Sequence, residues 1–258
     1  MGEADAKTIP WSRRRDALTT EKLRSGEFIV CGRFNLRTNV NDLMHMFSLV
    51  PAVGFAVSRV EPRFNIAPTQ PVVAVRLQSG MRQLTHLQWG LIPFWSKDPS
   101  SGGKMINARA ETVGSKPSFL SAFRSRRCLV LANGFYEWKS TPSGDKQPYH
   151  IQMRDGGPFA FAGLWEQWIG NAGETIDSCC IITTTPNELV SGIHDRMPAI
   201  LKTEDYDHWM DPEIHDTGSL ESLLVPYSAD AMLAYRVATL VNNPRNETVD
   251  CLMSIEDV

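Results

Sequence analysis

The chain has 258 residues, which is enough for one large domain or two small ones. Its 42% hydrophobic and 21% charged residues are ordinary for a soluble globular protein, and no apolar run is long enough to span a bilayer. A net charge of −3 argues at first against a protein that binds nucleic acid.

The chain begins with a polar segment. Residues 1–27 show weak periodicity and no obvious core face, so residues 1–30 are predicted to be a disordered extension. One domain is predicted at 31–245, followed by a C-terminal tail at 246–258. The three arginines at 13–15 are not followed by an apolar stretch, which excludes a secretory signal and leaves the cytoplasm as the expected compartment.

Beyond the extension, strand patterns dominate. Six strands are predicted, in chain order at 71–77, 82–92, 127–138, 148–153, 159–168 and 178–186. Helical patterns are fewer and are predicted at about 39–47, 117–123 and 203–210. Strands that pair with near neighbours, with helices interspersed, indicate an α+β fold around a curved, mostly antiparallel sheet.

The basic and acidic residues are distributed unevenly. Residues 31–140 carry 14 basic and 5 acidic side chains, whereas residues 141–258 carry 6 basic and 19 acidic ones. A basic first half can present a phosphate-binding face while the acidic half faces away. Alternatively, folding mixes the two halves and no patch survives, and the charge count leaves both outcomes open.

The five cysteines are odd in number and scattered, without CxxC spacing. Neither a disulfide scaffold nor a structural zinc site is therefore expected. Cys128, Cys179 and Cys180 lie in apolar runs and are predicted to be inert core residues.

Six short segments contain chemically reactive side chains, prolines or glycines at positions where a purely structural strand would have alternating apolar and polar residues. They are CGRF at 31–34, NIAPTQ at 65–70, WGLIP at 89–93, NARAET at 107–112, GFYEW at 134–138 and HDRMP at 194–198. Each alone is a weak signal. In this order they resemble the SOS response associated peptidase (SRAP) family, over about residues 31–245.

The resemblance implies a single barrel-like domain with peripheral helices, whose partner is single-stranded DNA containing abasic sites. It implies no cofactor, no metal and no membrane partner, and a monomer that joins the nucleoid when bound to DNA. In that family the cysteine follows the initiator methionine, which is removed. The freed cysteine captures the aldehyde of a ring-opened abasic site as a thiazolidine, and thiol autopeptidase and lyase activities are the enzyme classes implied.

Cys31 fits this chemistry on its own terms. Only an N-terminal cysteine presents an amine and a thiol on adjacent carbons, so that an imine formed with an aldehyde can close to a five-membered ring. An α-amino group has a pKa of ~7.7–8.0, so a useful fraction is neutral near pH 7. For an arbitrary cysteine a buried structural thiol is the better interpretation, and the CGRF context reverses that preference.

In this chain, however, Cys31 follows Val30 and a 30-residue extension. Valine is what translation writes for an internal GTG codon, and GTG can serve as a start codon, so translation from position 30 would give Met-Cys. Alternatively, the extension is real and the protein cleaves the Val30–Cys31 bond itself. The lack of a structural pattern in residues 1–27 favours the first explanation.

Two residues are predicted to handle protons. Glu137 lies within an apolar, aromatic strand, where burial would raise the pKa of its carboxyl group; a solvent-facing strand position is the equal alternative. His194 stands in a loop, from which an imidazole can hydrogen-bond the sugar ring oxygen. A lone histidine is more often a satisfied surface or core group, and Asp195 either orients it or pairs with Arg196.

Other residues are predicted to position the substrate. By the resemblance, Asn107 holds the cysteine backbone or the substrate, and Arg109 contacts a phosphate beside the lesion. Arg33 is a second phosphate candidate, because a guanidinium group binds phosphate oxygens bidentately. For each arginine the alternative is an internal ion pair, for example between Arg109 and either Glu111 or Glu137.

Phe94 and Trp95 form an aromatic tip before a loose, glycine-containing loop. Aromatic rings beside a lysine in a loop can stack on unpaired bases, and a hydrophobic plug under the loop is the alternative. Some relatives carry a second tryptophan where this chain has Ser96, which weakens any duplex-wedging role. Asn65 and Pro68 are predicted to shape the wall of the DNA-binding pocket.

Two other functions remain open on the sequence. A general thiol peptidase or N-terminal-nucleophile amidohydrolase would use Cys31, His194 and Glu137 as nucleophile, base and orienting group. The basic, aromatic-tipped half of the chain counts against it. The third interpretation is a non-covalent single-stranded-DNA-binding module in which Cys31 is incidental.

Overall fold

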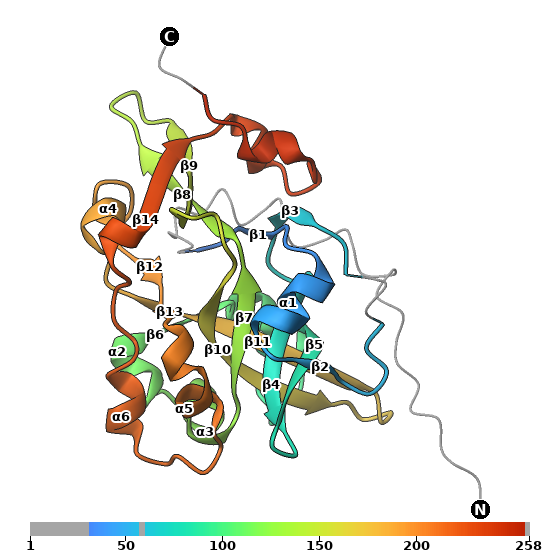
Figure 1. Ribbon diagram of the computed structural model, residues 1–258. Helices are drawn as coiled ribbons and strands as arrows, with labels where there is room; N and C mark the ends of the chain where they lie inside the picture. Colours follow the sequence, from blue (N-terminus) through green and yellow to red (C-terminus); the bar gives the residue numbers. More distant parts are fainter. Residues whose placement is uncertain (1–30, 57–59, 256–258) are drawn as a thin grey trace, which may run out of the picture.

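The structure is a computed structural model that describes residues 31–56 and 60–255 (Figure 1). The extension predicted at 1–30 lies outside the described residues. The first of two sheets has five strands, all paired antiparallel. Their order is β14 (Met232–Arg236), β9 (Lys146–Met153), β8 (Gly134–Ser140), β1 (Phe34–Leu36) and β3 (Arg63–Ile66).

The second sheet has nine strands. Seven follow one path, in the order β12 (Met197–Pro198), β11 (Thr175–Thr184), β10 (Phe159–Ile169), β7 (Arg127–Ala132), β4 (Pro71–Gln78), β5 (Met81–Trp89) and β2 (Val50–Pro51). Off this path, β13 (Ile200–Leu201) pairs with β10 and β6 (Asn107–Arg109) pairs with β11. Strand β11 also pairs with β5, so β11, β10, β7, β4 and β5 close into a ring. The predicted α+β fold on a barrel-like, mostly antiparallel sheet is confirmed.

The two faces of the five-stranded sheet pack against different parts of the molecule, because successive strand residues point to opposite faces. On the inner face, Phe34 lies edge-on to Trp89 and to Phe161, with ring centroids 5.1 and 5.7 Å apart. On the outer face, Tyr136 packs with Val237, Val241 and Cys251 in a second, smaller core. The C-terminal segment, residues 237–252, therefore covers the back of the sheet.

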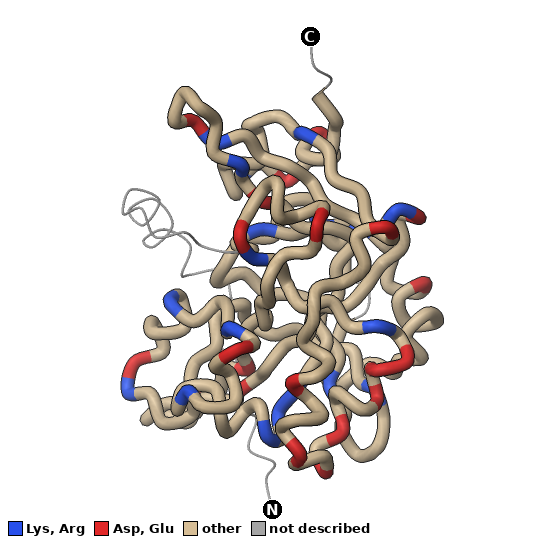
Figure 2. Tube along the Cα trace, turned by 90° about the vertical axis from the view of Figure 1, so that its left-hand side faces the viewer, with Lys and Arg blue, Asp and Glu red and all other residues tan. Residues whose placement is uncertain are grey.

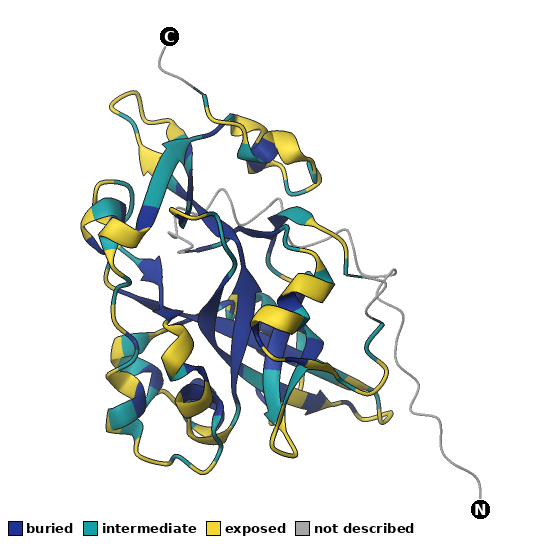
Figure 3. Cartoon of the chain, in the orientation of Figure 1, coloured by how far each residue is buried: buried dark blue, intermediate teal, exposed yellow. Residues whose placement is uncertain are grey.

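Within residues 31–56 and 60–255, six short helices lie around the sheets. They are α1 (Val40–Met46), α2 (Ala110–Val113), α3 (Pro117–Ser125), α4 (Glu188–Ser191), α5 (Tyr206–Met210) and α6 (Thr217–Glu221). Short 3-10 turns occur at Pro99–Lys104, Thr203–Asp205, Ala229–Ala231, Thr239–Asn242 and Val249–Leu252. Figure 3 shows exposed residues concentrated on helices and loops, while the central strands are buried. Across the described ranges, no helix has the length and apolar character needed to cross a membrane.

The single strand predicted at 127–138 is wrong, because β7 and β8 belong to different sheets. The break is at Asn133, whose side-chain oxygen accepts hydrogen bonds from the backbone of Arg37 and Thr38. Gly134 follows, where a Cβ atom would lie 2.3 Å from the ring of His150. The chain therefore changes sheets within one apolar run.

The uneven charge distribution is partly cancelled in the fold. In the part of the chain that the structure describes, all five arginine–carboxylate ion pairs join a residue of 31–140 to a residue of 141–255. The pairs are Arg63–Glu247, Arg76–Asp177, Arg82–Asp207, Arg126–Glu166 and Arg196–Glu111. Figure 2 shows basic and acidic positions interspersed along the trace, so the two halves do not form two separate charged faces.

Candidate active site

Cys31 and Glu137 are in direct contact. The backbone nitrogen of Cys31 donates a hydrogen bond to Oε1 of Glu137 at 2.6 Å, and both residues are buried. Cys31 precedes β1, which pairs with β8 through Phe34 and Phe135. That antiparallel register carries the chain before β1 past the middle of β8, where Glu137 lies.

The backbone of Cys31 is strained. Its φ angle is 44°, in the left-handed region that residues other than glycine rarely adopt. Such a conformation costs roughly 1–2 kcal/mol for a residue with a Cβ atom. Strain of this kind persists only where the surrounding structure enforces it, and it concentrates at functional sites.

Burial sets the protonation of both groups. It raises the pKa of Glu137 to about 8; the Cys31 N–H bond opposes this rise, the charge of Asp195 adds to it, and Lys146 opposes it. Burial, followed by the charge of Glu137, also raises the pKa of the Cys31 thiol well above its usual value. At neutral pH, Glu137 is therefore mostly a carboxylic acid and Cys31 a thiol. The solvent-facing alternative for Glu137 is excluded.

His194 lies in the loop between α4 and β12, with only 8% of its side chain exposed. Its Nδ1 atom accepts a hydrogen bond from the backbone N–H of Arg196 at 3.2 Å and lies 3.0 Å from Oδ1 of Asp195. Burial lowers the pKa of His194, although Asp195 works in the opposite direction. The imidazole is therefore mostly neutral near pH 7.

Asn107 and Arg109 lie on β6, which runs parallel to β11. Asn107 is half-buried and Arg109 is exposed. The ion pair considered between Arg109 and Glu111 is replaced by another, because Glu111 forms a bidentate pair with Arg196. This pair joins α2, the helix after β6, to the His194 loop across the end of β11.

Two residues predicted to contact DNA form internal bonds instead. The Arg33 guanidinium donates to Asn65 Oδ1 at 2.8 Å and to the carbonyl of Val241 at 2.6 Å, and it lies over the Trp138 ring. Asn65 is fully buried and donates to the carbonyls of Val241, Asn243 and Asn246. Both side chains thus hold the C-terminal segment on the outer face of the sheet, away from the face on which Cys31 packs.

The aromatic tip projects from the surface. Phe94 and Trp95 are 56% and 57% exposed, so neither ring is a plug beneath the loop. The base of the tip is fixed by the Trp168 indole, which donates to the carbonyl of Ser96 at 2.7 Å. Pro68 is half-buried.

The charges that act on the pKa values of Glu137 and His194 are not evident from the sequence. Asp195 and Lys146 influence the pKa of both groups, so the Cys31–Glu137 pair and the His194 loop share one electrostatic environment. Lys146 begins β9 after a polar turn, and nothing in that turn distinguishes it from a solvent-exposed lysine. The sequence around Asp195 predicts only that it orients His194 or pairs with Arg196, not that it acts on Glu137.

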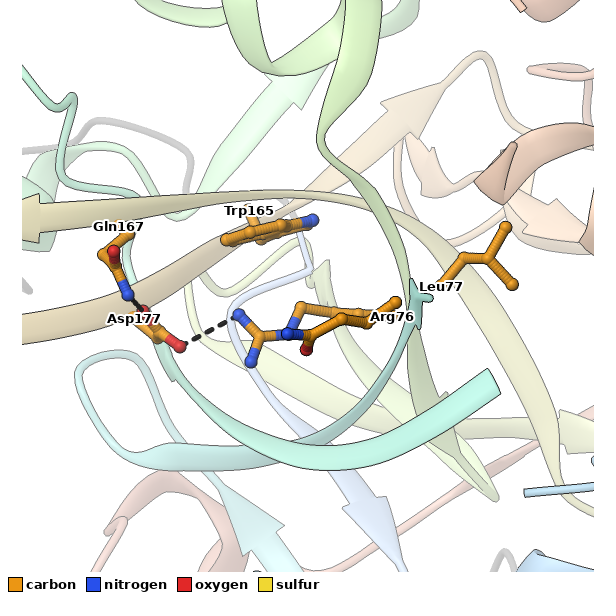
Figure 4. Close-up of a pocket in the computed structure, with 6 residues that line it drawn as sticks. Arg76, Leu77, Trp165, Gln167 and Asp177 are labelled. Atoms are coloured by element: carbon orange, nitrogen blue, oxygen red, sulfur yellow. Dashed lines mark hydrogen bonds and ion pairs between the residues drawn. The ribbon is translucent and has the colours of Figure 1, made fainter. Parts of the chain in front are cut away.

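A separate cavity of about 300 Å³ is lined by residues of β4, β10 and β11 (Figure 4). There the guanidinium of Arg76 lies 4.5 Å from the centre of the Trp165 ring and pairs with Asp177 at 2.9 Å. Gln167 also donates to Asp177. None of the predicted site residues lines this cavity. Within 31–56 and 60–255, no cluster of three or more His, Cys, Asp or Glu residues is arranged to hold a metal ion.

Comparisons with known proteins agree on one family. A sequence model described as SOS response associated peptidase (SRAP) matches residues 30–244. The abasic site processing protein YoqW of Bacillus subtilis (strain 168) is 43% identical over 225 residues, which cover 87% of this chain and all of that protein. The abasic site processing protein HMCES of Xenopus tropicalis is 34% identical over 200 residues, covering 69% of this chain and 59% of that protein. A crystal structure of a Bacteroides thetaiotaomicron protein has a TM-score of 0.77 at 26% identity, covering 87% of this chain and 100% of that one.

Proposed function

Since this chain belongs to the SOS response associated peptidase family, we propose that it processes abasic sites in DNA by capturing them covalently through Cys31. The names of the relatives support the substrate class, because YoqW and HMCES are both abasic site processing proteins. The observation that carries the chemical part of the proposal is the 2.6 Å contact between the Cys31 nitrogen and the Glu137 carboxyl.

The first step joins the Cys31 amine to the aldehyde carbon of the ring-opened sugar. The amine attacks the carbonyl to give a carbinolamine, which must then lose its hydroxyl group as water. Glu137 is positioned beside the reacting nitrogen, and burial raises the pKa of its carboxyl group, so we assign it as the donor of the proton that leaves with the water. The product is an iminium ion, and Glu137 is left as a carboxylate.

The second step closes the ring. The Cys31 sulfur adds to the iminium carbon, and the thiol proton passes to the Glu137 carboxylate, which restores the acid. An amine, an aldehyde and a thiol have then given one thiazolidine and one water, with no external oxidant or reductant. A carboxyl group with a pKa near 8 suits this exchange, because it both gives and takes a proton near neutral pH.

The reaction requires Cys31 to carry a free amine. Two routes lead there: translation from position 30, or self-cleavage of the Val30–Cys31 bond. The family match begins at residue 30, one position before Cys31, which supports a functional chain that starts at the cysteine. The strained φ angle of Cys31 and its contact with Glu137 also support self-cleavage, because cutting the bond releases the strain beside a proton donor.

The remaining predicted residues receive roles around the lesion. We assign His194 to the sugar ring oxygen, Asn107 to the substrate or the cysteine backbone, and Arg109 to a neighbouring phosphate. Phe94 and Trp95 are assigned to unpaired bases, which their exposure supports. A general thiol peptidase is disfavoured, because such enzymes need a thiolate and burial raises the pKa of the Cys31 thiol.

The test uses a single-stranded oligonucleotide with one abasic site, incubated with a chain that begins at Cys31 and analysed on a denaturing gel. A shifted band is expected. It should be absent with undamaged DNA, and with an abasic site whose aldehyde has been reduced by borohydride. A sample expressed as the full 258 residues should crosslink only if mass spectrometry shows that residues 1–30 have been removed from it. Crosslinking by the intact chain would contradict the proposal.

A further inference from the structure

The loop that carries His194 is anchored by one arginine. Arg196 donates from Nη1 to Oε1 of Glu111 at 2.7 Å and from Nη2 to Oε2 of Glu111 at 2.9 Å. Its Nη2 atom also donates to the carbonyl of Thr183 at 2.6 Å. A planar, bidentate pair of this kind fixes direction as well as distance. The backbone of Arg196 is therefore held against α2 and the end of β11.

This anchor determines which hydrogen-bond partner Nδ1 of His194 has. The backbone N–H of Arg196 donates to Nδ1 at 3.2 Å, which requires that nitrogen to be an acceptor. The proton of the neutral ring then lies on Nε2. Oδ1 of Asp195 is 3.0 Å from the same Nδ1 atom, and a hydrogen bond there requires the proton on Nδ1 instead. A neutral imidazole satisfies one of these contacts at a time.

We propose that Glu111 is a positioning residue for His194. By holding Arg196, it keeps the Arg196 N–H on Nδ1 and so selects the tautomer with the proton on Nε2. The role of His194 in opening the sugar rests on the proposed function, but the choice of tautomer does not. Glu111 touches neither the cysteine nor His194 and acts through Arg196.

A purely stabilising role does not account for Glu111. Its side chain is 47% exposed, and half-exposed ion pairs contribute little to the free energy of unfolding. The Arg196 guanidinium lowers the pKa of Glu111, so the pair persists through the neutral range. Among the described residues, the charged groups that act on the pKa of His194 are Asp195 in the same loop and Lys146 on β9, and neither is altered by a change at Glu111.

The experiment compares Glu111→Ala and Glu111→Gln with the matched control Asp207→Asn. Asp207 forms an arginine pair of similar length, 2.7 Å with Arg82, and is not among the predicted site residues. Ring-nitrogen 15N NMR on histidine-labelled protein beginning at Cys31 reports the tautomer, and a His194→Gln variant assigns the His194 signals. The wild type and Asp207→Asn should show one neutral tautomer, with Nδ1 unprotonated.

In Glu111→Ala the His194 signals should move toward the tautomer protonated at Nδ1, as Asp195 takes over. Crosslinking to abasic DNA should slow by ~10–100-fold, the loss typical of metal sites when the partner that orients a functional histidine is removed. Glu111→Gln retains one acceptor and should fall between; it carries the test if Glu111→Ala does not fold. The affinity for undamaged single-stranded DNA should not change.

An unchanged tautomer in both Glu111 variants overturns the proposal. Tighter DNA binding with an unchanged tautomer would also overturn it, because Glu111 would then merely compete with phosphate for Arg196. A wild-type protein that fails to crosslink refutes the proposed function, but the NMR signals still decide the role of Glu111.

Discussion

The backbone nitrogen of Cys31 lies 2.6 Å from Oε1 of Glu137, although 106 positions separate the two residues in the sequence. The contact places a carboxylic acid beside the atom that becomes an amine once the chain starts at Cys31. The same burial that keeps Glu137 protonated also keeps the Cys31 sulfur a thiol. While the Cys31 nitrogen is a peptide amide, both groups are therefore mostly protonated at neutral pH.

Replacing Glu137 by glutamine tests its role as a proton donor. The amide retains an acceptor for the Cys31 nitrogen but cannot transfer a proton, so crosslinking should slow by ~100-fold. Single-turnover gels would measure the rate, and fluorescence anisotropy should show unchanged DNA affinity. Glu166→Gln is the control, because Glu166 is also buried but pairs with Arg126. A Glu137→Gln rate equal to the wild-type rate would remove this residue from the mechanism.

The raised pKa of Glu137 also predicts how stability depends on pH. The unfolded carboxyl titrates near ~4.3, whereas the folded one titrates at about 8. Between these values the folded state holds the extra proton, so the free energy of unfolding falls as pH rises, by at most ~1.4 kcal/mol per pH unit. Glu137→Gln lacks this dependence.

Urea denaturation at about pH 5 and about pH 8 measures the effect. The stability of Glu137→Gln relative to the wild type should increase from the lower pH to the higher one. Histidine titration contributes equally to both proteins and cancels in the difference. A difference that does not change with pH would mean that Glu137 ionises normally in the folded protein.

Changing the Cys31 side chain separates the two reacting groups. Cys31→Ser and Cys31→Ala retain the amine of a chain that starts at position 31, but they lack the thiol. Both should form only an imine, which borohydride traps by reduction, and both should give little denaturation-stable product. Abundant stable crosslink from Cys31→Ala would show that ring closure by sulfur is unnecessary.

Acetylating the Cys31 amine blocks the complementary group. The thiol remains, but no imine can form, so neither the stable product nor the borohydride-trapped product is expected. Mass spectrometry would establish the extent of acetylation before the gel assay. Equal crosslinking rates for the acetylated and free proteins would mean that the thiol acts alone, and the thiol-enzyme interpretation would then gain.

Trp95→Ala tests the aromatic tip. If the 57% exposed ring stacks on a base, its loss should weaken binding to undamaged single-stranded DNA by ~1–3 kcal/mol. Anisotropy titrations at fixed salt would measure the change. Met253→Ala is the control, because Met253 is similarly exposed at 61% but lies directly after the C-terminal segment. Equal affinities for Trp95→Ala and the wild type would leave the ring without a role in binding.

Arg109→Ala tests the phosphate contact. Arg109 is exposed, and no ion pair involves it within the described ranges. Removing one arginine–phosphate contact should reduce the slope of log K against log salt concentration by ~1, because fewer counterions are released. Arg82→Ala is the control, since Asp207 already neutralises that guanidinium. The same salt slope in Arg109→Ala and the wild type would exclude the contact.

The alternation of apolar and polar residues, together with the turn residues, was sufficient to predict the fold class, because both depend only on residues that are close in the sequence. It failed at 127–138, where β7 and β8 follow each other in one apolar run but enter different sheets. Only the side-chain bonds of Asn133 to the chain after β1 reveal that division, and those partners are almost a hundred residues away.

Motif order was sufficient to select Cys31 and Glu137, which the structure places in contact, but not to place Arg33. Arg33 is two residues from Cys31, a spacing that places both on one face of a regular strand. The left-handed φ angle of Cys31 breaks this alternation, and Arg33 bonds to the C-terminal segment instead. The Glu111–Arg196 pair likewise depends on β11, because this strand pairs with both β6 and β12 and so brings the two motifs together. Neither motif contains a residue of β11.

The bond from Arg33 to the Val241 carbonyl spans 208 positions, so Arg33 is synthesised long before the residue to which it binds. The strand that follows Cys31 leaves the ribosome well before residues 237–252, which cover its outer face. Until then the carbonyls that bind Arg33 and Asn65 do not exist, and the sheet behind the nucleophile remains unpacked. A nascent chain therefore carries Cys31 and Glu137 on a sheet whose outer face is still uncovered, until residues 237–252 have been added.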